Sequence, residues 1–174
     1  WESKGAETLA ELRQAYSVLD IGYSGDCTEN LVWRALNGEL DGYRAKCIVL
    51  MIGTNNSGNN HDDPRHTVQG VRRVLEVIAQ KQPEAVTLLL PIFPRGASPE
   101  DPVRVANEQV NAGIRPFADG KRVVWLDFNA QFLDAQGDTH WIMPDRLHPN
   151  AEGYRRWRDA VLPQLAVLVG DKAR

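Results

Sequence analysis

The feature that most constrains the fold is a nearly continuous apolar run at residues 45–52, in which a lysine is the only charged residue. A run of this length is typical of a strand that is covered on both faces, as in a parallel sheet under helices. A second run of the same kind covers residues 85–92 and is broken by Pro91. These two segments predict the buried centre of an α/β fold.

Helical patterns alternate with strand-like runs along the chain. Strands are predicted at residues 16–22, 45–52, 85–92 and 122–128. Helices are predicted at about residues 28–36, 64–81, 102–118 and 151–168. Asp63 before Pro64 and Asn150 before the last helix are capping residues. The order predicts a three-layer α/β sandwich with a parallel sheet, and residues 1–174 are expected to form a single domain because no linker or repeat interrupts them.

Composition excludes several classes of protein. The 20 basic and 23 acidic residues give a net charge of −3, and such a mixed chain gives no support for nucleic-acid binding. No apolar run approaches the roughly 20 residues that span a bilayer. Two cysteines cannot form a disulfide framework, and Cys47 is expected to be a buried thiol. We expect a soluble protein, but because the chain begins at Trp1 the sequence does not choose between a cytoplasmic and a secreted location.

The clearest chemical signal is Asp145-Arg-Leu-His148-Pro149, just before the last predicted helix. A histidine held in a loop three residues after an aspartate is suited to act as a general base with an orienting carboxylate. The alternative is an ordinary surface loop in which Asn150 caps the following helix.

Two earlier segments follow predicted strands. In parallel sheets, ligands bind outside the carboxyl ends of the strands, and both segments fall at such ends. Gly25 can bring a backbone N–H close to a substrate because it has no side chain. Asn55 offers a side-chain amide of the kind that stabilises an oxyanion. Each segment taken alone is more often a plain turn.

Taken together, these segments resemble the GDSL/SGNH hydrolases, and within them the catalytic subunits of platelet-activating-factor acetylhydrolase and their bacterial relatives. The resemblance covers essentially the whole chain. The matching segments are Gly22-Tyr-Ser-Gly-Asp26, Trp33-Arg34, Asn37-Gly-Glu-Leu40, Ile52-Gly-Thr-Asn-Asn56, Pro94-Arg95-Gly96 and the Asp-x-x-His-Pro block.

The resemblance implies a flavodoxin-like fold and a serine esterase that acts through an acyl-enzyme without a metal or an organic cofactor. Gly25 and Asn55 would form the oxyanion hole, His148 would be the base and Asp145 its orienter. The expected substrate is a small acylated molecule, chiefly an acetyl ester of a sugar, a lipid or an alcohol. The resemblance leaves open whether the protein forms a homodimer.

The chain departs from the family because the Gly-Asp-Ser block that supplies the nucleophile is absent. Ser24 is interpreted as a turn residue, and Cys27 belongs to no block. We expect the serine a handful of residues before Trp1, preceded by a central first strand. Residues 1–174 alone are expected to fold poorly and to be inactive. The alternatives are a non-catalytic binding module that has lost its nucleophile and an unrelated flavodoxin-like binding domain.

Weaker candidates lie elsewhere. Trp141 and Met143, in the loop before His148, are candidates for lining the acyl or leaving-group pocket. Trp33 and Trp157 fall on apolar helix faces and are expected in the core. Four further residues have side chains of the kind that bind metal ions: His61, Asp62, Asp63 and His66. The two aspartates are better explained as helix-capping groups, and the two histidines as solvated side chains.

Overall fold

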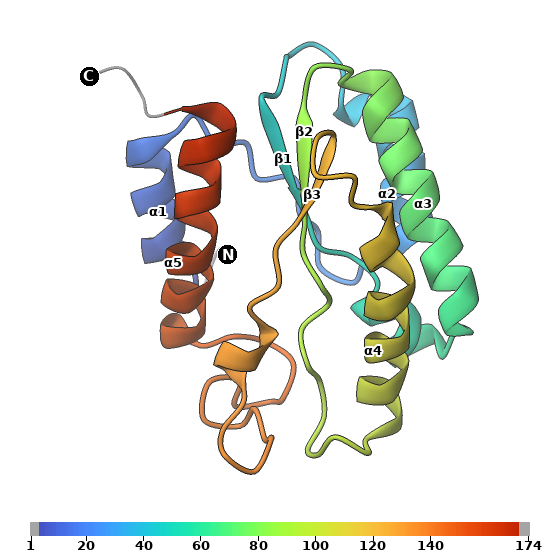
Figure 1. Ribbon diagram of the computed structural model, residues 1–174, viewed down its shortest axis with the longest axis vertical. Coiled ribbons are helices and arrows are strands. Elements are labelled where there is room, and N and C mark those ends of the chain that lie inside the picture. The colour runs from blue at the N-terminus through green and yellow to red at the C-terminus, as the bar shows by residue number, and fades with distance from the viewer. Residues whose placement is uncertain (1–3, 171–174) are drawn as a thin grey trace.

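In a computed structural model of the chain, which describes residues 4–170, a small parallel sheet lies between two layers of helices (Figure 1). The strands are β1 (Cys47–Leu50), β2 (Val86–Leu89) and β3 (Val123–Trp125), and they are hydrogen-bonded in the order β1-β2-β3. Leu88 in the central strand pairs with Val49 on one side and Val124 on the other, and it is completely buried. The predicted parallel sheet is therefore confirmed.

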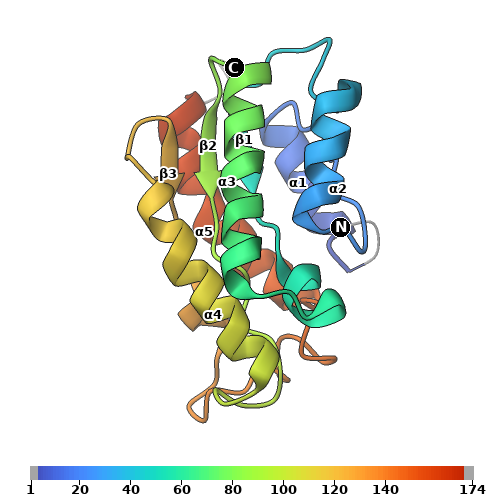
Figure 2. The same cartoon turned by 90° about the vertical axis from the view of Figure 1, so that its right-hand side faces the viewer.

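The helices divide between the two faces of the sheet (Figures 1 and 2). On one face lie α2 (Thr28–Arg34), α3 (Pro64–Lys81) and α4 (Pro102–Ile114), and on the other lie α1 (Ala6–Ala15) and α5 (Ala151–Val169). The remaining helical turns are η1 (Ala35–Glu39), η2 (Asn56–Asn60), η3 (Arg115–Phe117) and η4 (Asn129–Phe132). Because each layer buries its own apolar cluster against the sheet, the predicted three-layer sandwich is also confirmed.

The predicted helix starts are confirmed by their capping bonds. The Asp63 carboxylate accepts a hydrogen bond from the Arg65 N–H at 2.8 Å, and Pro64 occupies the first helical position, where its missing N–H costs nothing. Asn150 accepts from the Gly153 N–H at 3.0 Å and so begins α5. Both helices end within a residue of the predicted position.

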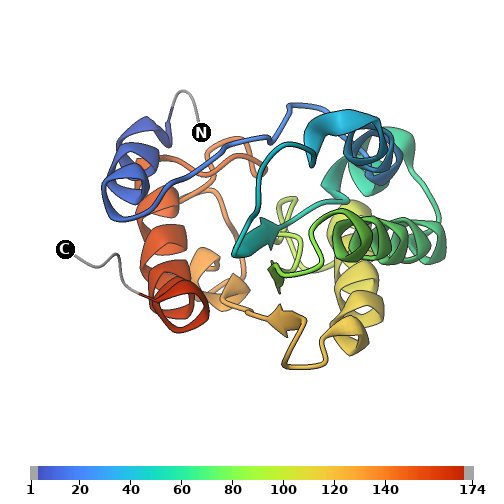
Figure 3. The same cartoon turned by 90° about the horizontal axis from the view of Figure 1, so that it is seen from above.

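The predicted strand at residues 16–22 is wrong, and the helix α1 before it was not predicted. The chain between α1 and α2 runs past the β1 side of the sheet (Figure 3), but no backbone hydrogen bond joins residues 16–22 to a strand within the described part of the chain. A strand is defined by a hydrogen-bonded neighbour, so this apolar segment remains irregular.

The interpretation of Trp33 as a core residue is also wrong. Its side chain is 66% exposed, and Leu36 one turn later is 41% exposed. The short α2 packs instead through Leu31 and Val32 onto the cluster under α3. Trp157, in contrast, packs against the buried cluster on the α5 side, as predicted.

The close approach of α2 and α3 depends on a glycine. A Cβ built on Gly70, in the middle of α3, would lie 2.2 Å from Thr28 Oγ1, far inside van der Waals contact. The first turn of α2 can therefore touch α3 only because Gly70 has no side chain.

All three strands run in one direction, so their carboxyl ends share one edge of the sheet. The loops that follow them, near residues 51–63, 90–101 and 126–150, gather at the lower end of the molecule in Figures 1 and 2. Of the helices within residues 4–170, none is long and apolar enough to cross a membrane.

Candidate active site

His148 and Asp145 form the contact that their spacing predicts. Nδ1 of His148 lies 2.7 Å from Oδ2 of Asp145, a short hydrogen bond that fixes the ring and leaves Nε2 for chemistry. The other carboxylate oxygen accepts the backbone N–H groups of His148 at 2.7 Å and Leu147 at 3.1 Å. The His148 side chain is 63% exposed, so its ring is accessible from solvent.

The charge of Asp145 is stabilised by this geometry. Burial by itself would raise the pKa of Asp145, but the hydrogen bonds from the His148 N–H, the His148 ring and the Leu147 N–H together hold it well below its usual range. The carboxylate therefore stays ionised opposite the imidazole, as an orienting group for a general base must.

Gly25 and Asn55 are brought together by a direct bond between their segments. The Asn55 Nδ2 donates to the carbonyl of Asp26, the residue after Gly25, at 2.9 Å. The Asn55 Oδ1 accepts from Asn59 Nδ2 at 3.1 Å, so both ends of the amide are fixed and one N–H remains for a ligand. Gly25 has φ +82°, a left-handed conformation that favours glycine, and the space beside its Cα is open.

A second asparagine, Asn56, joins the same two segments through hydrogen bonds. It is 2% exposed, and its Oδ1 accepts the Thr28 N–H at 3.0 Å. Its Nδ2 donates to Asp62 at 2.9 Å and to Glu29 at 3.2 Å. The start of α2, the turn after β1 and the approach to α3 are thus joined at one buried amide.

The loop after β2 connects the asparagine turn to the histidine loop. Nη1 of Arg95 donates to the carbonyl of Thr54 at 3.1 Å, one residue before Asn55. The N–H of the next residue, Gly96, donates to the carbonyl of Arg146 at 3.2 Å, between Asp145 and His148. The Gly25–Asn55 pair and the Asp145–His148 pair are therefore tied to one another through two consecutive residues.

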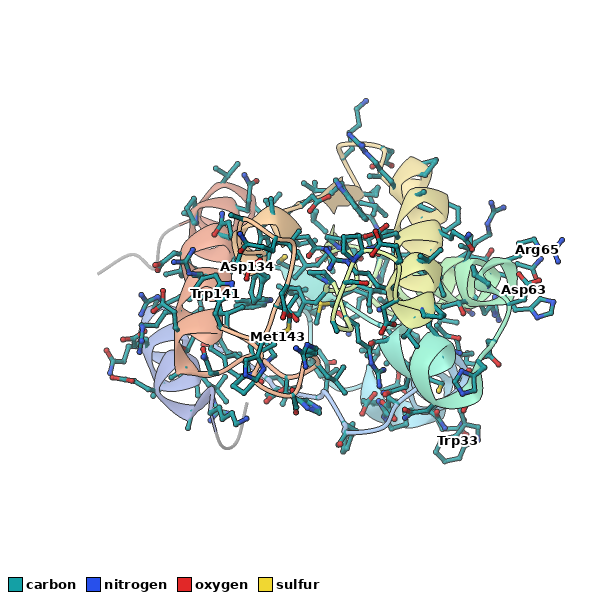
Figure 4. The ribbon with its side chains drawn as sticks, turned by 90° about the horizontal axis from the view of Figure 1, so that it is seen from below. Trp33, Asp63, Arg65, Asp134, Trp141 and Met143 are labelled. Carbon is teal, nitrogen blue, oxygen red and sulfur yellow. The ribbon has the colours of Figure 1, made fainter. Side chains whose placement is uncertain are left out.

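The two weaker candidates, Met143 and Trp141, differ in how far they are exposed. Met143 is fully buried in the apolar cluster under α5, so its side chain faces the core. Trp141 is 43% exposed, and the guanidinium of Arg156 lies 4.9 Å from its ring centroid. Figure 4 shows Trp141 on the opposite side of the molecule from Trp33.

The acidic residues near His61 are used in structural contacts. Asp62 accepts from Asn56, and Asp63 caps α3 and pairs with Arg65, pointing outward in Figure 4. Within residues 4–170, no group of three or more histidine, cysteine, aspartate or glutamate side chains is placed to hold a metal ion.

Asn56 and Arg95 lie within the segments that resemble the family, but their structural roles were not predicted from the sequence. Asn56 carries a weak signal, because it is a second amide directly after Asn55 in a predicted turn. Arg95 carries a stronger one, since it is the first charged residue after the uncharged segment 85–94. Neither signal names the partner, which lies about 28 residues from Asn56 in one case and 41 residues from Arg95 in the other.

A parallel sheet between helices thus carries a histidine–aspartate pair and a glycine–asparagine pair at its carboxyl edge. The model of the GDSL-like lipase/acylhydrolase family matches residues 1–156. The chain therefore belongs to the GDSL-like lipase/acylhydrolase family.

Known proteins agree with this assignment. Platelet-activating factor acetylhydrolase IB subunit alpha1 from Homo sapiens is 34% identical over 150 residues, which are 85% of this chain and 63% of that protein. The alpha2 subunit from Rattus norvegicus is 32% identical over 152 residues, 86% of this chain and 65% of that protein. The chain thus spans less than two thirds of the length of these relatives.

Solved structures share the fold at lower identity. A mutant of an acetyl-xylooligosaccharide esterase from Geobacillus superposes with a TM-score of 0.71 at 19% identity, covering 92% of this chain and 79% of that one. A GDSL-like lipase from Bacteroides thetaiotaomicron gives a TM-score of 0.70 at 16% identity, covering 83% of this chain and 73% of that one. At these identities the likeness concerns the fold.

Proposed function

We propose that this protein is a serine esterase that hydrolyses short-chain esters, chiefly acetyl esters, through an acyl-enzyme. The observation that carries the proposal is the linkage of the two site halves by Arg95 and Gly96. It places a carboxylate-oriented imidazole and a fixed amide donor at the same edge of the sheet. These are the base and the electrostatic stabiliser that acyl transfer requires.

In the proposed reaction, the nucleophile is the serine of the family's first block, which is not among the 174 residues. Nε2 of His148 takes the serine proton as the hydroxyl oxygen attacks the ester carbonyl, and Asp145 stabilises the resulting imidazolium. The free N–H of the Asn55 amide and the N–H of Gly25 hold the developing oxyanion. His148 then protonates the leaving alcohol, and a water molecule that His148 activates hydrolyses the acyl-enzyme.

The preference for acetyl groups rests on relatives. The family members that the sequence matches are named acetylhydrolases, and a structural neighbour is named an acetyl-xylooligosaccharide esterase.

A second candidate function is a binding module that has kept the pocket and lost the nucleophile. Within residues 4–170, no serine side chain hydrogen-bonds to His148, so the contacts described fit this candidate as well. Ser57, in the asparagine turn, is buried and its Oγ has no partner, so it is not placed as an accessible nucleophile.

The decisive experiment compares two histidine variants of the natural full-length protein with p-nitrophenyl acetate as substrate. His148→Ala should lower kcat by several orders of magnitude, whereas His140→Ala, an exposed histidine in the same loop, should leave it unchanged. Labelling with a fluorophosphonate should identify the serine. Wild-type turnover by the His148→Ala protein would remove the esterase proposal. A wild-type protein that neither turns over the ester nor accepts the label would favour the binding module.

A further inference from the structure

An open depression of about 380 Å³ adjoins the histidine loop. Its walls come from three segments: residues 95–97 after β2, Asp101 and Val103 at the start of α4, and residues 145–147. The depression therefore lies directly beside the Asp145–His148 pair, on the side where the loop of Arg95 approaches it.

Most charged groups in this lining already have partners. Asp145 accepts three hydrogen bonds from His148 and Leu147. Asp101 caps α4 by accepting from the Val103 N–H at 3.0 Å. Arg146 is paired with Asp138 at 3.2 Å. These groups are held in the structure and offer little to a ligand.

Arg95 is different. Its hydrogen bonds all use Nη1 and go to Thr54, at 3.1 Å to the carbonyl and 3.5 Å to the hydroxyl. Among the described residues, no carboxylate forms an ion pair with its guanidinium, and no acceptor is bonded to Nε or Nη2. Neither atom is fully buried, so both are reached by solvent.

The free edge of Arg95 has a specific chemistry. Nε and Nη2 present two parallel N–H groups, the fork that binds a carboxylate or a phosphate in bidentate fashion. Nη1 is bonded to Thr54, and the guanidinium packs against Gly58, where an added Cβ would lie 1.9 Å from Nη1 and 2.9 Å from Nη2. The side chain is thus already oriented, and little rotamer entropy is lost on binding.

We propose that Arg95 binds a compact anionic group, a phosphate or a carboxylate, on the leaving-group part of the ester. The proposal rests on the proposed esterase function. The leaving oxygen must lie near His148, which protonates it, so its substituents extend toward the depression between residues 95–97 and 145–147. The preferred substrates are then acetyl esters of anionic alcohols.

The test measures discrimination in the natural full-length protein. The substrates are 4-acetoxybenzoate, 4-acetoxyphenyl phosphate and the neutral methyl 4-acetoxybenzoate. Arg95→Gln should lower the ratio of kcat/KM for an anionic ester to that for the neutral ester by about 10- to 100-fold, as expected for a charge-assisted hydrogen bond. The anion with the larger loss identifies phosphate or carboxylate as the natural group.

Two further variants make the ratio interpretable. Arg95→Lys keeps the charge but not the fork, so it should lose less discrimination than Arg95→Gln. Arg44→Gln removes the same charge at the opposite end of β1, where the side chain is 87% exposed, and should leave the ratio within about 2-fold of wild type. The ratio cancels any shared loss that arises from releasing Thr54.

Each outcome decides between roles. Equal losses on anionic and neutral esters in Arg95→Gln would mean that Arg95 only holds the Thr54 turn, and the anion subsite would be rejected. If wild type hydrolyses none of the three esters, the esterase proposal fails, and calorimetric titration with inorganic phosphate then tests the subsite alone. Binding by wild type that is lost in Arg95→Gln retains the subsite, and no binding by wild type rejects it.

Discussion

Asn56→Asp tests whether the buried amide of Asn56 holds the segments of Gly25 and Asn55 in place. The change keeps the size of the side chain and leaves the acceptor for the Thr28 N–H, so it creates no cavity. It removes the donor to Asp62 and Glu29 and puts a third carboxylate within about 3 Å of theirs.

The magnitude follows from these contacts. Each lost hydrogen bond to a charged group costs about 1.5–3 kcal/mol, and the bond to the exposed Glu29 falls at the lower end. Repulsion between carboxylates adds to this loss, and solvent screening reduces it. We expect the free energy of unfolding to fall by about 3–6 kcal/mol, equivalent to a Tm decrease of roughly 6–24 °C for a chain of this size.

The assay is urea unfolding of the natural full-length protein at pH 8 and pH 5. The introduced carboxyl has a folded pKa raised by its acidic neighbours, so its destabilisation is largest above that pKa and shrinks as the pH falls toward its unfolded value. Adding Asp62→Asn restores a hydrogen-bond donor to this cluster. The double variant should therefore recover about half of the lost free energy of unfolding, and its kcat should recover as well. A loss below about 1 kcal/mol at pH 8, or no recovery in the double variant, would refute the role of Asn56.

Three further predictions address single side chains. Asn55→Ala should lower kcat by about 10²- to 10³-fold with KM nearly unchanged in steady-state hydrolysis of p-nitrophenyl acetate, because its interaction is made in the transition state; an unchanged kcat would return Asn55 to a plain turn. Asp145→Asn should destabilise the fold at pH 7, and this difference should shrink below about pH 4, since a depressed folded pKa stabilises only above the unfolded value; a difference that is constant with pH in denaturant titrations would contradict it. Burial raises the pKa of Cys47 to about 11, so its thiol should react slowly with Ellman's reagent at pH 8 until denaturant is added, and rapid native labelling would disprove this.

The sequence predicts the elements whose signal is local. Strand-length apolar runs mark β1 and β2, and the caps Asp63 and Asn150 mark the starts of α3 and α5, because each signal arises from neighbouring residues. Residues 16–22 have an apolar pattern like a strand, but a strand also needs a partner, which no local pattern supplies.

The site shows the same division. The contact of Asp145 with His148 spans three residues and follows from their spacing. The bond from Asn55 to Asp26 spans 29 residues, and here the resemblance to a family brought the two segments together before the fold was known. The exposure of Trp33 depends on which side of α2 meets α3, and the apolar pattern of that short helix is too broad to decide it.

The absence of a side chain at Gly70 has a consequence for protein engineering. Replacing a glycine within a helix by alanine is a standard route to higher thermal stability, worth about 1 kcal/mol. Here the added methyl would meet Thr28 at 2.2 Å and push away the turn of α2 that Asn56 holds beneath the site. Thermostabilised versions of this protein will have to leave that helix position alone and draw their gains from surfaces that do not support the candidate site.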